Sequence, residues 1–123
     1  MQPRETLTSE ELALLLTEPV QQAIAAARGR DPLQVALDRR IPHARLVATQ
    51  VKYLARAEAK LPSYAAAQCI LPPLAFEQAS SEACAAHKQI AGGAVLDLTC
   101  GLGADAFFLA RRFRRVVALE RDQ

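Results

Sequence analysis

The sequence predicts a mainly α-helical chain that ends in one strand–helix–strand unit. The 123 residues are 51% hydrophobic, and this share includes 25 alanines and 17 leucines but six aromatic residues, which favours helices. Near residue 92 the hydrophobic pattern changes from a helical period to two short apolar runs typical of strands. We therefore divide the chain into an N-terminal helical domain with its connector, residues 1–76, and a second domain that begins within residues 77–123.

Composition and cysteine spacing exclude several classes of protein. No apolar run approaches the ~20 residues that a membrane helix needs, and the first residues lack the pattern of a signal peptide. Cys69, Cys84 and Cys100 form no CxxC pair and match no common metal site, so we expect small buried side chains in a reducing compartment. The sequence predicts a cytoplasmic protein with no membrane partner and no metal.

Capping residues and prolines divide the first 60 residues into four helices. Thr8 or Ser9 is a good N-cap, and proline is tolerated in a first turn but not inside a helix. Residues 62–76 are expected to form a connector, because Pro72 and Pro73 interrupt helices and central strands. A fifth helix is expected over 77–90. The four earlier helices are expected over 9–16, 18–28, 32–38 and 42–60.

The fourth predicted helix has two contrasting faces. One third of its helical wheel is apolar, and the opposite side is basic. Residues 28–60 as a whole contain eight Lys and Arg but three Asp and Glu. Such a surface can meet phosphate, and a plain solvated helix face is the alternative. The apolar side comprises Val47, Val51, Leu54, Ala55 and Leu61, and the basic side comprises Arg45, Lys52, Arg56 and Lys60.

The end of the sequence predicts one β–α–β unit. Residues 94–98 are a short apolar run after two glycines, which fits a buried parallel strand. A glycine-containing turn leads to a predicted helix over 105–113, and a second strand over 116–119 ends at Glu120. The crossover of such a unit is expected to be right-handed.

The turn and the acid after the second strand indicate a bound adenosine. Gly101 and Gly103 let the backbone approach a ligand closely, and the helix start adds unpaired N–H groups. Glu120 follows Gly103 by 17 residues, where a carboxylate can accept hydrogen bonds from both ribose hydroxyls. The sequence therefore predicts a cofactor that contains adenosine.

NAD and S-adenosylmethionine both contain adenosine, but they do not fit this pattern equally well. Residues 101–106 match the dinucleotide pattern GxGxx(G/A), which favours NAD. Asp97, four residues before the first of these glycines, would repel the pyrophosphate of NAD. It suits the amino group and sulfonium of S-adenosylmethionine instead. An NAD-type oxidoreductase stays open as the less favoured alternative.

The segment VLDLTCGLGAD (residues 95–105), with Glu120 downstream, resembles the first two motifs of class I S-adenosylmethionine-dependent methyltransferases. KLPS (60–63) and LAFEQASSE (74–82) are similar to a bacterial family of methyltransferase-like proteins with a C-terminal THUMP-like domain. The resemblance spans about residues 40–122. It implies that a Rossmann-like S-adenosylmethionine-binding domain begins near residue 77 and that the methyl acceptor is RNA.

The same resemblance implies individual roles. Asp97 would lie near the methionine amino group and Glu120 would bind the ribose. Asp105 would cap the following helix or approach the methionine end. Four residues would lie near the cofactor pocket: Glu77, Gln78, Ser80 and Ser81. Thr99 replaces the first glycine of the usual GxGxG loop and would contact the methionine carboxylate. The predicted cofactor residues are Asp97, Thr99, Gly101, Gly103, Asp105 and Glu120.

The pattern also lacks features of a whole enzyme of this class. Such a sheet has about seven strands, and the substrate motif follows the fourth. This sequence has two predicted strands and no (D/N)PP(Y/F) motif. We therefore expect an N-terminal fragment of an RNA methyltransferase, inactive by itself, with no assignable catalytic residue. Its exposed strand edges are expected to self-associate, and its basic helix face to meet RNA. A non-enzymatic helical interaction module is a further alternative.

Overall fold

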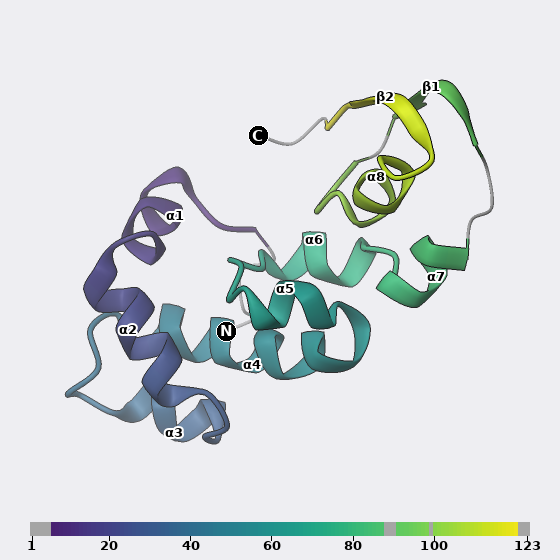
Figure 1. Ribbon diagram of the computed structural model, residues 1–123. Coiled ribbons are helices and arrows are strands. Elements are labelled where there is room, and N and C mark those ends of the chain that lie inside the picture. Colours follow the sequence, from purple (N-terminus) through teal and green to yellow (C-terminus); the bar gives the residue numbers. More distant parts are fainter. Residues whose placement is uncertain (1–5, 88–90, 99, 121–123) are drawn as a thin grey trace. The chain divides into compact units, whose positions relative to one another are not determined.

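The computed structural model describes residues 6–87, 91–98 and 100–120. It is mainly helical, with a parallel two-stranded sheet near its C-terminal end, which confirms the predicted fold class (Figure 1). The chain forms two compact units, residues 1–76 and 77–123. Among the described residues, no helix combines the length and hydropathy needed to cross a bilayer.

The first unit is built from short helices around one long helix. α1 begins with a capping box: the Glu11 N–H donates to Thr8 Oγ1 (3.1 Å), and the Thr8 N–H donates to Glu11 Oε2 (2.9 Å). The long helix starts two residues later than predicted, because His43 adopts a left-handed conformation (φ 49°). The helices are α1 (Ser9–Leu15), α2 (Glu18–Ala27), α3 (Pro32–Leu37), α4 (Ala44–Lys60), α5 (Pro62–Ala66) and α6 (Pro73–Gln78).

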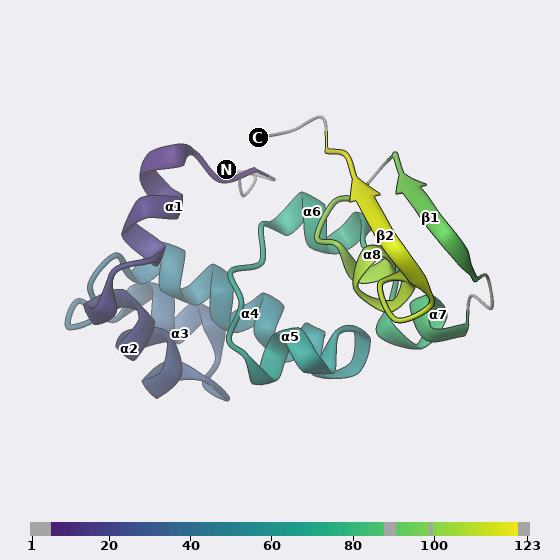
Figure 2. The same cartoon turned by 45° about the horizontal axis from the view of Figure 1, so that its top comes forward.

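The core of this unit forms around α4, which contacts α2, α3 and α5 (Figure 2). The predicted apolar face of α4 is correct apart from Ala55, which is exposed. Gln50 and Tyr53 are buried in addition. The face is therefore wider than a purely hydrophobic pattern indicates, because a polar side chain can be buried when it is hydrogen-bonded. The other members of this core include Leu15, Ile24, Val35, Val47, Leu54 and Phe76.

The predicted connector over 62–76 is wrong, since it contains α5 and the start of α6. Pro62 and Pro73 each stand at the first position of a helix, where the missing N–H costs nothing. The buried Gln50 side chain holds the segment between these helices. Its Nε2 donates to the Leu71 carbonyl (3.1 Å), and the Leu71 N–H donates to its Oε1 (2.8 Å).

The second unit contains α7 (Glu82–His87), β1 (Gly92–Asp97), α8 (Ala104–Leu109) and β2 (Phe113–Ala118). The single helix predicted over 77–90 is wrong, because α6 ends at Gln78 and α7 starts anew at Glu82. Ser81 causes the restart, as its Oγ accepts a hydrogen bond from the Cys84 N–H (3.1 Å). Positions 88–90 of the predicted helix lie outside the described residues.

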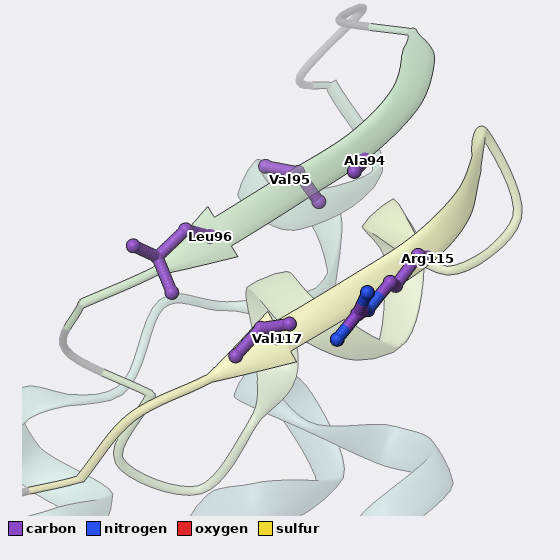
Figure 3. Close-up of a pocket in the computed structure, with 5 residues that line it drawn as sticks. All are labelled: Ala94, Val95, Leu96, Arg115 and Val117. Atoms are coloured by element: carbon purple, nitrogen blue, oxygen red, sulfur yellow. The ribbon is translucent and has the colours of Figure 1, made fainter.

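β1 and β2 pair in parallel, with Ala94 opposite Arg115 and Asp97 opposite Ala118. α8 packs against the two strands, as the views in Figures 1 and 2 agree. The expectation of a buried first strand is wrong, because every residue of β1 is exposed or half-buried and Leu96 is 53% exposed. Val117 on β2 is 37% exposed. Figure 3 shows the open hollow on these strands, lined by Ala94, Val95, Leu96, Arg115 and Val117.

Candidate cofactor-binding site

The turn between β1 and α8 depends on two glycines in the left-handed region, Gly101 (φ 54°) and Gly103 (φ 79°). Other residues adopt this conformation only with strain. The Gly103 N–H donates to the Cys100 carbonyl (2.8 Å), and the Gly103 carbonyl accepts from the Phe107 N–H (2.8 Å). Cys100 is also joined to the end of β2, because its N–H donates to the Leu119 carbonyl (2.9 Å). The turn is thus fixed to both α8 and β2.

The structure brings Asp97, Gly101 and Glu120 together at the carboxyl ends of the two strands. Asp97 ends β1 opposite Ala118, and its carbonyl accepts a hydrogen bond from the Leu119 N–H (2.8 Å). The Gly101 N–H donates to Glu120 Oε2 (2.5 Å). Both predicted acids therefore flank the glycine turn. Ligands of parallel α/β sheets bind outside this edge of the sheet.

The hydrogen bond from Gly101 orients the Glu120 side chain toward the turn. Glu120 is exposed just after the end of β2. A carboxylate can accept more than one hydrogen bond, so this group is chemically suited to bind a vicinal diol from the solvent.

Asp105 is tied to a more distant segment. The Ser80 hydroxyl donates to Asp105 Oδ2 (3.2 Å), and Asp105 Oδ1 is hidden from solvent. The N-cap of α8 is Gly103, without a side-chain cap, so the capping role expected as one alternative for Asp105 is wrong. Contact with the methionine end of a cofactor stays a prediction. Thr99 lies outside the described residues.

The carboxylates create a negative environment inside the turn. Burial, followed by the negative charges of Asp97 and Glu120, raises the pKa of the Cys100 thiol above its ordinary value. The expectation of buried cysteines is wrong: Cys84 is exposed, and Cys69 and Cys100 are half-buried. Among the described residues, no group of three His, Cys, Asp or Glu side chains is arranged to hold a metal ion.

The turn geometry can be tested with a matched pair of glycine variants. Gly103→Ala is expected to destabilise the second unit by about 1–2 kcal/mol, because alanine resists the left-handed conformation. Gly93→Ala is the control, since a Cβ added there meets no atom within 4 Å and φ is not positive. Amide hydrogen exchange of Val95 and Val116 measures both changes. Equal protection in the two variants would contradict the assigned turn.

The first unit holds the other predicted site residues. Arg45, Lys52 and Arg56 are exposed on α4, whereas Lys60 is half-buried.

No sequence pattern links Ser80 and Asp105, because they lie 25 residues apart and belong to no common period. The available signal was the resemblance of the segment LAFEQASSE, which contains Ser80.

Comparison with known proteins gives one informative match. No family model matches the sequence, and no curated protein matches it. The fold is similar to a solved structure described as a "putative methyltransferase from Porphyromonas gingivalis W83", with a TM-score of 0.70 and 27% sequence identity. The match covers 96% of this chain and 30% of that protein, so the chain spans under a third of its length. The helices and the β–α–β unit together thus resemble part of a protein described as a methyltransferase.

Proposed function

We propose that residues 92–120 contribute to the S-adenosylmethionine site of a methyltransferase. The observation that supports this best is the pair of acids, Asp97 and Glu120, at adjacent strand ends on either side of a two-glycine turn. The fold similarity to a protein described as a methyltransferase supports it independently.

The charge around the turn favours S-adenosylmethionine over NAD. Asp97 and Glu120 both raise the pKa of the Cys100 thiol, so a second anion placed at this turn is disfavoured. Asp97 is half-buried, and its Oδ2 is hidden from solvent, which strengthens its interaction with nearby charge. A pyrophosphate would be repelled here. An ammonium and a sulfonium would be attracted.

In this proposal, different residues at the turn bind different parts of the cofactor. Glu120 accepts hydrogen bonds from the ribose hydroxyls, and Asp97 orients the amino group of the methionine end. Gly101 and Gly103 leave room for the ligand beside the backbone, because they have no Cβ. Asp105 and Thr99 are assigned to the methionine end. The cofactor supplies an activated methyl group on its sulfonium.

RNA is the acceptor that we propose for the whole enzyme. The resemblance of residues 60–63 and 74–82 to methyltransferase-like proteins with a THUMP-like domain supports this choice. Methyl transfer belongs to the proposed enzyme as a whole, since the matched structure is much longer than this chain.

A titration followed by amide NMR shifts tests the choice of cofactor. S-adenosylhomocysteine is expected to bind the 123-residue chain weakly, with a Kd of about 1 mM, because the described sheet has two strands and an uncovered face. Shift changes should be confined to the amides of residues 97–105 and 118–120. NAD⁺ at the same concentration is expected to leave these amides unchanged. Stronger changes with NAD⁺, or none with S-adenosylhomocysteine at 5–10 times that Kd, would contradict the proposal.

A further inference from the structure

We propose that Arg45, Lys52 and Arg56, on one face of α4, bind the phosphodiester backbone of RNA. This inference rests on the proposed RNA acceptor and adds which side chains contact it. The three residues are spaced by seven and four positions along one continuous helix. They therefore form a single row, with steps of about 10 Å and 6 Å along the helix axis.

Aromatic rings underneath hold two of these cations in place. Lys52 Nζ lies 5.5 Å and Arg56 Cζ lies 5.4 Å from the centroid of the Tyr53 ring. Arg56 Cζ also lies 5.3 Å from the centroid of the Phe76 ring. Cation–π attraction at such distances favours ordered side chains, and Lys52 and Arg56 are both exposed. Ordering before binding lowers the entropy lost when a phosphate is bound.

Lys60 is not part of this row of phosphate contacts. Its Nζ donates to the Phe76 carbonyl (2.7 Å) and lies 4.8 Å from the Phe76 ring centroid. The side chain is half-buried, and its ammonium already holds α6 through the Phe76 carbonyl. The basic face expected from the sequence therefore reduces from four cations to three.

The surroundings of the row favour a phosphate backbone over bases or lipid. Tyr53 is 8% exposed and Phe76 is 1% exposed, so neither ring offers a free face on which a base can stack. The apolar side of α4 is buried in the core, as Val47 and Val51 show. A membrane-surface helix needs an exposed apolar face, which α4 lacks. The contacts are therefore expected to be electrostatic and independent of base sequence.

Fluorescence anisotropy with a labelled 20-nucleotide oligo(U) over a salt series tests the row. Three phosphate contacts predict a slope of about −2 in log K against log salt, and loss of one contact predicts about −1.4. Lys52→Ala and Arg56→Ala are each expected to weaken binding roughly eightfold at 50 mM salt. Arg39→Ala is the matched control, because Arg39 is an exposed cation outside α4. Arg39→Ala and Lys60→Ala are expected to leave the slope near −2.

The results separate failure of the row from failure of the proposed function. Equal losses of oligo(U) affinity for Lys52→Ala and Arg39→Ala would mean that diffuse positive charge, and not the row on α4, binds the phosphates. Binding to anionic vesicles but not to oligo(U) would mean that the row binds a membrane surface and not RNA. Because the row contacts phosphates alone, oligo(dT) is expected to bind about as tightly as oligo(U) and to give the same slopes. S-adenosylhomocysteine should cause the same amide shift changes in Lys52→Ala as in the wild type. Absence of these changes in the wild type would contradict the proposed cofactor site and would leave the test of the row unaffected.

Discussion

Replacing Gln50 with leucine is expected to destabilise the helical unit by roughly 2–4 kcal/mol. Leucine removes the side chain that satisfies both the N–H and the carbonyl of Leu71, and both atoms lie in a buried position. Leaving a buried polar group without a hydrogen bond costs the free energy of its desolvation. Leucine is close in size to glutamine, so little of the loss is expected to come from a cavity.

Urea unfolding followed by helical circular dichroism measures this change. Gln34→Leu is the matched control, because Gln34 is exposed on α3, and surface substitutions usually change stability by about 0.5 kcal/mol or less. A Gln50→Leu variant as stable as the control would show that Gln50 does not hold the stretch between α5 and α6.

Glu120 variants are expected to give the largest change in cofactor binding. Glu120→Ala removes the proposed ribose acceptor, and loss of two charge-assisted hydrogen bonds of about 1.5 kcal/mol each lowers affinity roughly a hundredfold. Glu120→Gln keeps an oxygen that can accept the Gly101 N–H but removes the charge, so we expect an intermediate loss. At the S-adenosylhomocysteine concentrations used for the wild type, Glu120→Ala is therefore expected to show almost no amide shift changes, and Glu120→Gln reduced ones. Glu10→Gln, on an exposed position of α1, is the charge-matched control.

A measurement without ligand checks the Glu120→Gln variant. Because the Glu120 carboxylate helps to raise the pKa of the Cys100 thiol, neutralising it should lower that pKa toward its ordinary value. The pH dependence of Cys100 alkylation, read by mass spectrometry, reports the change. An unchanged Cys100 pKa would mean that Glu120 does not face the turn, and unchanged cofactor affinity would mean that it does not bind the ribose.

Local chemistry explains what could be predicted from the sequence. Two features predict the β–α–β unit and its turn. They are the glycines before and after β1 and the two short apolar runs separated by a helical stretch. Prolines are ambiguous: Pro73 is expected to interrupt a helix, and Pro62 opens the expected connector, although a proline also fits the first turn of a new helix. Ser81 fits a helix cap, but serine is ordinary both inside and between helices, so the sequence did not show that one helix ends at Gln78 and another starts at Glu82.

Contacts between distant residues could not be predicted, since no period links them. Gln50 and Leu71 lie 21 residues apart, and a glutamine on α4 gives no sign of burial until its partner is known. The Phe76 contacts of Lys60 are of the same kind, because Phe76 belongs to a segment expected to be irregular. The sheet face is exposed at Leu96 (53%) and Val117 (37%), because two parallel strands and one helix cannot cover both faces of a sheet.

In the proposed site, Glu120 binds the ribose and Asp97 binds the methionine end of the cofactor. Intermolecular nuclear Overhauser effects test this placement most directly. S-adenosylhomocysteine would be added to the ¹⁵N-labelled chain, and contacts from its protons to backbone amides would be recorded. We expect ribose protons to contact the amides of Leu119 and Glu120, and methionine-end protons to contact those of Asp97 and Leu98. Ribose contacts at Asp97, or contacts confined to the strand face around Leu96 and Val117, would contradict the account.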